Sequence, residues 1–144
     1  MKNVFLADDD EDDIDLFKQA ALDVCPDMEI TAVTDGSKLI DRLEVATPPK
    51  PDCIFLDINM PKMDGFACLD ALKKKKEFRD IPVIVYSTSG MHSDISKMYA
   101  AGADLYITKP MNYSGLKGIL EIVCNLEFSK DYVRTTFKNF HFKA

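Results

Sequence analysis

The 144-residue sequence predicts an α/β fold, in which an open, doubly wound parallel sheet carries helices on both faces. Five short apolar runs alternate strictly with five segments whose apolar residues recur at helical spacing. Most of these runs are apolar throughout rather than at every second position, which is typical of strands that are covered on both faces. Five strand–helix units are too few for an eight-stranded barrel, so we expect an open sheet.

The five predicted strands lie between polar residues or prolines, at residues 4–7, 28–33, 53–56, 83–86 and 105–107. After each strand, apolar residues three or four positions apart predict an amphipathic helix. These residues are, in chain order, Ile14, Phe17, Ala21 and Val24; Leu39, Ile40 and Leu43; Phe66, Leu69 and Leu72; Ile95, Met98 and Tyr99; and Leu116, Ile119, Leu120 and Val123. Pro26 ends the first helix, a proline-rich stretch at 48–51 ends the second, and Gly102 closes the fourth.

The formal net charge of −6 is concentrated at the N-terminus. Residues 1–15 hold seven acids and one lysine, and the remaining residues hold equal numbers of acids and bases. A domain that binds nucleic acid through an overall basic charge is therefore disfavoured. The four cysteines lack CxxC spacing, which argues against a zinc site. The N-terminal apolar run is too short for a signal peptide and no segment has the length of a membrane span, so we expect a cytoplasmic protein without membrane insertion.

Polar residues follow four of the predicted strands. Asp8 to Asp10 follow the first strand, Asp57 the third, Ser87 the fourth and Lys109 the fifth. The carboxyl ends of parallel strands meet at one edge of the sheet, where open α/β sheets bind their ligands. Clustered carboxylates repel one another, and a hard divalent cation such as Mg²⁺ relieves this repulsion. A carboxylate beside Mg²⁺ and a lysine is suited to attack a phosphoryl group.

Residues 57–65, with the sequence DINMPKMDG, resemble the phosphoacceptor loop of response-regulator receiver domains. Further motifs that resemble this family follow in its usual order: the acidic pair after the first strand, Ser87, Tyr106 and Lys109-Pro110. The resemblance covers about residues 2–126. It implies a flavodoxin-like (βα)5 three-layer sandwich with the parallel sheet order 2-1-3-4-5. It also implies a response regulator of the stand-alone, single-domain type in a two-component phosphorelay.

The resemblance assigns a metal site around the phosphoacceptor. Asp57 resembles the residue that accepts phosphate from a histidine kinase. Asp9 resembles the main ligand of the Mg²⁺ ion, and Asp8 resembles its water-mediated or supporting partner. Asp57 itself and the backbone carbonyl of Asn59 would complete the protein ligands.

The resemblance also assigns the residues that act on the phosphoryl group. Lys109 resembles the lysine that pairs with the phosphoryl oxygens, and Ser87 resembles the hydroxyl residue that moves to hydrogen-bond them. Tyr106 resembles the aromatic switch that turns inward when Ser87 moves. The Lys109–Pro110 peptide bond resembles one that is cis in the family, which is consistent with the proline that follows. Such a protein is a signalling phosphoacceptor that catalyses only its own phosphorylation and dephosphorylation.

Two other functions on a similar sheet are less compatible with the residues. A phosphohydrolase with an aspartate nucleophile needs a second carboxylate two residues later, where this chain has Asn59. A flavin carrier needs a hydroxyl- and glycine-rich phosphate loop after the first strand, where this chain has acids. Asp8 and Asp9 aside, the acids between residues 8 and 15 are expected to form the solvated first turn of the first helix. These acids are Asp10, Glu11, Asp12, Asp13 and Asp15.

The chain is expected to comprise a receiver domain over residues 1–128 and an aromatic, basic tail over residues 129–144. Val133, Phe137 and Phe140 fit helical spacing, whereas Phe140 and Phe142 fit a strand. We expect the tail to pack on the domain or on a second copy. The expected partners are a sensor histidine kinase or phosphotransfer protein, a downstream protein that binds the face of the fourth helix, fifth strand and fifth helix, and a second copy in a homodimer.

Overall fold

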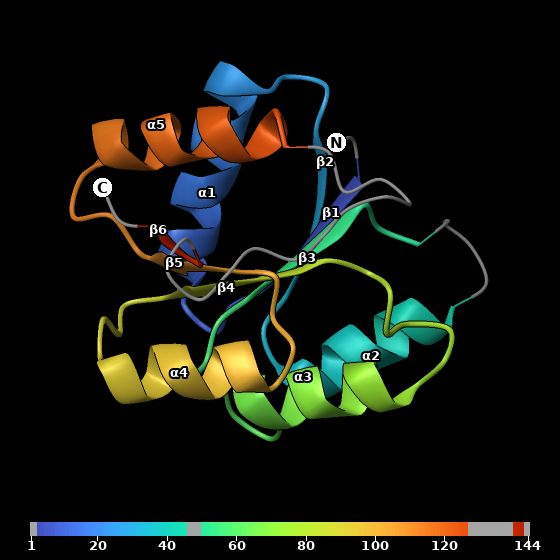
Figure 1. The fold of residues 1–144 in the computed structure, drawn as a ribbon. Coiled ribbons are helices and arrows are strands. Elements are labelled where there is room, and N and C mark those ends of the chain that lie inside the picture. The colour runs from blue at the N-terminus through green and yellow to red at the C-terminus, as the bar shows by residue number, and fades with distance from the viewer. Residues whose placement is uncertain (1–2, 46–49, 127–139, 143–144) are drawn as a thin grey trace.

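The structure, a computed structural model, describes residues 3–45, 50–126 and 140–142. Strands and helices alternate along the chain (Figure 1). The strands are β1 (Asn3–Ala7), β2 (Glu29–Val33), β3 (Cys53–Leu56), β4 (Val83–Ser87), β5 (Leu105–Thr108) and β6 (His141–Phe142). The helices are α1 (Glu11–Val24), α2 (Gly36–Glu44), α3 (Gly65–Lys74), α4 (His92–Ala100) and α5 (Tyr113–Cys124). None of the described helices is both long and apolar enough to cross a membrane.

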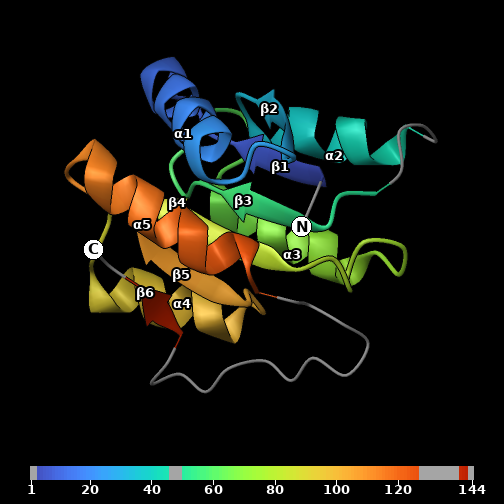
Figure 2. The same cartoon turned by 90° about the horizontal axis from the view of Figure 1, so that it is seen from above.

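The described strands form one parallel sheet in the order β2-β1-β3-β4-β5-β6. The first five strands have the predicted order 2-1-3-4-5. Helices α1 and α5 cover one face of the sheet, and α2, α3 and α4 cover the other (Figures 1 and 2). The fold is therefore the predicted three-layer sandwich. Its central strands are buried on both faces, which explains why their sequences are apolar without alternation.

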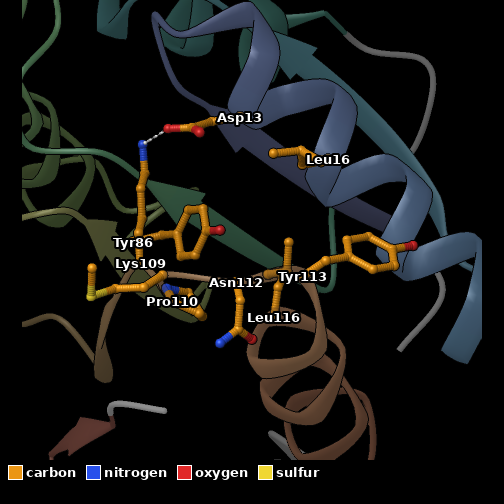
Figure 3. A pocket seen from close by; sticks show the side chains of 9 residues that line it. Asp13, Leu16, Tyr86, Lys109, Pro110, Asn112, Tyr113 and Leu116 are labelled. Carbon is orange, nitrogen blue, oxygen red and sulfur yellow. Dashed lines mark hydrogen bonds and ion pairs between the residues drawn. The ribbon is translucent and has the colours of Figure 1, made fainter.

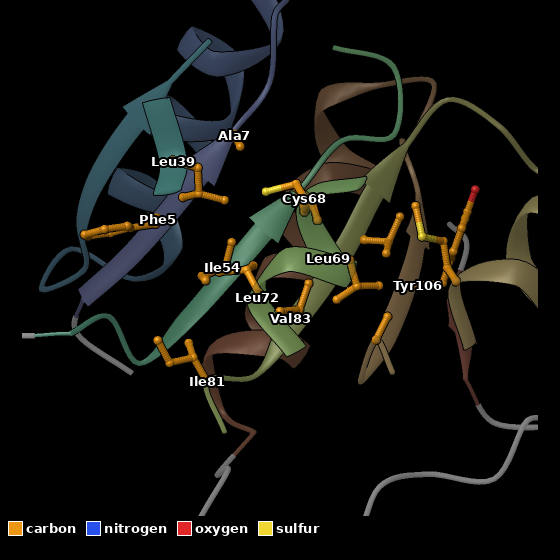
Figure 4. Packing of buried hydrophobic residues seen from close by; sticks show 14 of the residues in the cluster. Phe5, Ala7, Leu39, Ile54, Cys68, Leu69, Leu72, Ile81, Val83 and Tyr106 are labelled. Carbon is orange, nitrogen blue, oxygen red and sulfur yellow. The ribbon is translucent and has the colours of Figure 1, made fainter. Parts of the chain in front are cut away.

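Each face of the sheet packs against its helices through a separate apolar cluster. Figure 4 shows the cluster under α2, α3 and α4, in which Ile54 of β3 lies near Leu69 and Leu72 of α3. On the opposite face, Phe55 of β3 packs edge-on against Phe17 of α1, with 4.9 Å between the ring centroids. Because close packing on both faces holds the strands, the loops at their carboxyl ends start from fixed points.

Four of the five described helices begin at a side-chain cap, and each of these helices follows the carboxyl end of a strand. The capping side chains, which accept hydrogen bonds from backbone N–H groups of the first turn, are Asp10, Asp35, Asp64 and Asn112. Such caps stabilise a helix by about 1 kcal/mol each. They also determine where each helix starts after its strand, and so which residues face the strand ends.

Sequence patterns left the conformation of the tail open between a helix and a strand. Residues 127–139, 143 and 144 lie outside the described residues. The described part of the tail forms the short strand β6, which pairs in parallel with β5 of the same chain. Phe140 is fully buried, and its ring packs edge-on against Tyr99 with 5.0 Å between centroids. Pairing with β6 satisfies backbone groups that an edge strand would expose.

Candidate functional site

The side chains predicted for the site come together at the carboxyl edge of the sheet. Asp8 and Asp9 follow β1, Asp57 follows β3, Ser87 is the last residue of β4, and Lys109 follows β5. Asp8, Asp57 and Ser87 are buried, whereas Asp9 is exposed. The sheet order places β1, β3, β4 and β5 side by side, so residues far apart in the sequence lie next to one another.

Lys109 joins the acidic residues. Its ammonium nitrogen Nζ donates hydrogen bonds to Asp13 Oδ2 at 2.8 Å and to Asp57 Oδ2 at 3.2 Å. The same nitrogen lies 2.7 Å from Asp8 Oδ2 as an ion pair. Burial by itself would lower the pKa of Lys109, but the hydrogen bonds and the charges of these carboxylates raise it above its ordinary value. Lys109 therefore remains a cation over the whole physiological pH range.

Asp8 is the most deeply buried carboxylate of the site. Its Oδ1 accepts a hydrogen bond from the backbone N–H of Asp10 at 3.0 Å. Its Oδ2 is buried and, among the described residues, has no hydrogen-bond donor in suitable geometry despite the ion pair with Lys109. Burial raises the pKa of Asp8 from 3.8 to about 6, and the contact with Lys109 offsets this only in part. A buried carboxylate that Lys109 compensates only in part can accept a further cation.

The acidic cluster fits a divalent cation. Carboxylate oxygens of Asp8, Asp9 and Asp57 all lie within 4.8 Å of one another. All of these donors are oxygens, and hard cations such as Mg²⁺ and Mn²⁺ prefer oxygen ligands. Asn59, whose backbone carbonyl the resemblance assigned as a further ligand, lies exposed on the loop two residues after Asp57. The residues present therefore suit a divalent metal ion.

The loop between β3 and α3 holds Asp57 in place through backbone contacts. The N–H of Asp57 donates to the carbonyl of Ala7 at 2.9 Å, which ties it to β1. The N–H of Ile58 donates to Asp57 Oδ1 at 2.7 Å. The N–H of Gly65, at the start of α3, donates to the carbonyl of Ile58 at 2.7 Å. One carboxylate oxygen of Asp57 is thus bound to the backbone, and the other faces Lys109.

Ser87 and Tyr106, the predicted switch pair, are linked through one loop. The side-chain oxygen of Ser87 accepts a hydrogen bond from the N–H of Ser89 at 3.2 Å. The Tyr106 hydroxyl donates to the carbonyl of Ser89 at 2.8 Å. Tyr106 is fully buried, and Phe140 and His141 of the tail pack against its ring. A movement of Ser87 would therefore reach Tyr106 through the loop that contains Ser89.

Asp13 is a member of the site that the sequence analysis missed. It was expected to be a solvated acid in the first turn of α1, but its carboxylate binds Lys109 (Figure 3). Its position four residues before the buried Phe17 is a signal that could have indicated it, because residues four apart share a helix face. Asp12, next to it, is exposed.

Asp8→Asn is expected to stabilise the metal-free protein near neutral pH but not in acid. The unfolded chain loses the Asp8 proton near pH 3.8, whereas the folded protein retains it up to about pH 6. The unfolded state binds fewer protons within this window, so wild-type stability falls as the pH rises through it. Two pKa units amount to roughly 1–3 kcal/mol. Urea unfolding in the presence of a chelator, at about pH 4 and about pH 7.5, measures the stability of Asp8→Asn relative to wild type. If the stability difference between the two proteins is the same at both pH values, the raised pKa of Asp8 is contradicted.

Comparisons with known proteins agree with this geometry. The family model described as the response regulator receiver domain matches residues 4–121. Response regulator Rcp1 of Synechocystis sp. is 30% identical over 130 residues, which cover 88% of this chain and 86% of Rcp1. The phosphorylated cyanobacterial phytochrome response regulator RcpA has a similar structure, with a TM-score of 0.78 and 36% identity over 85% of this chain and 90% of RcpA.

A solved structure of Rcp1 in its Mn²⁺-bound form also matches. Its TM-score is 0.78 with 26% identity, and the match covers 94% of this chain and 100% of that one. The family match runs from Val4 in β1 to Glu121 in α5, so it includes strands β1 to β5 except Asn3, and the five described helices except the last turn of α5. The fold, the acidic cluster and these comparisons lead to one conclusion: this chain belongs to the response regulator receiver domains of two-component signalling.

Proposed function

We propose that residues 1–128 form a phosphoacceptor switch in which Asp57 takes a phosphoryl group from a sensor histidine kinase or a phosphotransfer protein. The observation that carries this proposal is the position of Asp57. It is buried at the end of β3, lies within 3.2 Å of the ammonium of Lys109, and shares one carboxylate cluster with Asp8 and Asp9. A carboxylate beside a fixed cation can attack phosphorus, because the charge of the transferred group is neutralised nearby.

Asp57 would act as the nucleophile. A carboxylate oxygen forms a bond to phosphorus while the bond from phosphorus to the donor breaks, and the donor leaves with the electron pair. Oδ2 faces Lys109, whereas Oδ1 accepts the N–H of Ile58. Lys109 would pair with the phosphoryl oxygens, and Ser87 would hydrogen-bond them. The Lys109–Pro110 peptide, proposed to be cis, would hold the lysine at the end of β5.

Mg²⁺ is the proposed cofactor. Asp8, Asp9 and Asp57 would hold it, together with the backbone carbonyl of Asn59. When bound, the ion neutralises part of the negative charge on the transferred phosphoryl group. The burial of Asp8 Oδ2, whose near neighbour is the ammonium of Lys109, and the closeness of the three carboxylates support this assignment.

The proposed output is a change in the surface of α4, β5 and α5 that a downstream protein binds. Ser87 would move toward the phosphoryl group, and Tyr106 would follow through its hydrogen bond to Ser89. Phe140 and His141 pack on Tyr106, so the described part of the tail lies next to this surface. The tail over residues 129–144 is therefore proposed to modify the output, and a homodimer through the same surface is part of the proposal.

Phosphoryl uptake tests the proposal directly. The protein is incubated with acetyl phosphate and Mg²⁺, and its intact mass is recorded. The expected result is a gain in mass of one phosphoryl group in the presence of Mg²⁺. No gain is expected when a chelator is present during the incubation. If a folded protein that binds Mg²⁺ gains no mass, Asp57 is not a phosphoacceptor and the proposal fails.

A further inference from the structure

Lys109 contacts a third carboxylate, that of Asp13, in addition to Asp8 and Asp57 of the candidate site. Its Nζ lies 2.7 Å from Asp8, 2.8 Å from Asp13 and 3.2 Å from Asp57, measured to Oδ2 in each case. Asp8 and Asp57 belong to the candidate metal cluster, whereas Asp13 does not. Asp13 comes from the first turn of α1 rather than from a strand end. A single ammonium group is thus divided between two buried metal-site carboxylates and one outer carboxylate.

The outer position of Asp13 follows from the cap of α1. The Asp10 side chain accepts hydrogen bonds from the backbone N–H groups of Asp12 and Asp13, which places both in the first turn. The Asp13 side chain is 29% exposed, against 8% for Lys109 and 0% for Asp8. Figure 3 shows the Lys109 side chain reaching past Tyr86 toward Asp13. Asp13 therefore holds the ammonium from the side nearer to solvent.

This arrangement sets up a competition for one cation. A hydrogen bond to Asp13 holds the Lys109 ammonium away from Asp57. A phosphoryl group on Asp57 would need that ammonium to neutralise its own negative charge. The Asp13 carboxylate also repels the anionic phosphodonor. At the same time, a lysine held toward Asp13 neutralises Asp8 and Asp57 less, and this leaves those carboxylates more negative toward a divalent ion.

We infer that Asp13 is a positioning residue that restrains Lys109, which favours metal binding and slows phosphoryl uptake. The inference rests on the proposed phosphoacceptor function. The contact with Asp13 must weaken when Lys109 turns to a phosphoryl group. Breaking this contact adds to the energy barrier for phosphoryl uptake, so Asp13 slows that step. Its removal has opposite effects on two measurements: Mg²⁺ binds more weakly, and phosphorylation at saturating Mg²⁺ becomes faster. A residue that only stabilised the fold would impair both.

Asp13→Asn tests this inference, with Asp12→Asn as the matched control. Asp12 lies in the same helical turn, carries the same charge and is exposed. Calorimetric titration measures the Mg²⁺ dissociation constant, and the intact mass over time measures phosphorylation by acetyl phosphate. For Asp13→Asn we expect the Mg²⁺ dissociation constant to rise by about three- to tenfold, which is the size of effect expected for the loss of one partly buried charge. We expect the phosphorylation rate at saturating Mg²⁺ to rise by about the same factor, for the same reason. Asp12→Asn is expected to stay within about twofold of wild type in both, and Asp13→Glu, which keeps the carboxylate, to lie closer to wild type than Asp13→Asn.

Three results would overturn the inference. Asp13→Asn could match Asp12→Asn in both measurements, in which case the contact with Lys109 has no influence. Both measurements could be impaired together with a lower melting temperature, which assigns Asp13 a structural role. Asp13→Asn could bind Mg²⁺ with the wild-type affinity while the wild-type protein takes up no phosphoryl group, in which case neither predicted effect is observed. In contrast, absent uptake with the expected loss of Mg²⁺ affinity in Asp13→Asn refutes the phosphoacceptor function and leaves the restraint of Lys109 in place.

Discussion

Asp57→Asn is expected to abolish phosphoryl uptake while leaving the domain folded. The substitution keeps the size and shape of the side chain but replaces the nucleophilic carboxylate with an amide, which does not attack phosphorus under these conditions. Lys109 retains Asp8 and Asp13 as partners, so no buried cation is left unpaired. Mg²⁺ binding should also weaken, because the metal cluster loses one of its three carboxylates. Intact mass after incubation with acetyl phosphate and Mg²⁺ measures the uptake.

The control for this experiment is a carboxylate outside the metal cluster. Asp12→Asn removes one charge from the same acidic region, and we expect it to gain one phosphoryl group as wild type does. A circular dichroism melt of both variants shows whether they are folded. Uptake by Asp57→Asn at the wild-type rate would place the acceptor on another residue and would refute the assignment of Asp57.

Gly65→Ala is expected to destabilise the domain and to disturb Asp57, the proposed phosphoacceptor. A Cβ atom at this position would lie 2.2 Å from the carbonyl oxygen of Asp57 and 2.7 Å from the Cα of Ile58. Both are backbone atoms that cannot rotate away, so α3 or the loop before it must shift. Overpacking of this kind costs about 3 kcal/mol when the surroundings yield little. Because a shift of about 1 Å at a reacting group can lower a rate by roughly a hundredfold, phosphoryl uptake should fall as well.

Equilibrium unfolding in urea measures the stability loss, and Gly118→Ala is the matched control. Gly118 lies within α5 and is exposed, and a Cβ atom added there would meet no atom within 4 Å outside its own helix backbone. The same substitution there should raise the stability by about 0.5–1 kcal/mol, because alanine is the better helix former. If Gly65→Ala is as stable as wild type and takes up phosphate normally, the close approach of α3 to Asp57 is not a constraint.

Much of the site could be predicted because its residues adjoin the strands. Asp8, Asp57, Ser87 and Lys109 each follow or end a strand that its own apolar residues define. Parallel strands place their carboxyl ends at one edge, so adjacency in the sequence becomes adjacency in space. The strand order 2-1-3-4-5 was implied by the resemblance, and it places the four strand ends concerned next to one another.

Two features depended on contacts that local sequence patterns do not specify. Asp13 and Asp12 are both acids in one helical turn, and only the packing of α1 beside the end of β5 turns Asp13 toward Lys109. The tail pattern around Phe140 suited a helix as well as a strand. Its conformation was decided by the open edge of β5 and by the rings of Tyr99 and Tyr106, which together bury Phe140.

By itself, the sequence determined the five alternating units and the acidic edge, because periodicity and strand-end residues are local properties of the chain, and residues 57–65 carried the resemblance to a phosphoacceptor loop. The tertiary structure alone decided which acid restrains Lys109 and what covers β5. Both outcomes depend on distances between segments that are 96 and 35 residues apart in the chain. Such distances arise only when the helices pack on the sheet, since that packing selects one partner among residues of equal local propensity.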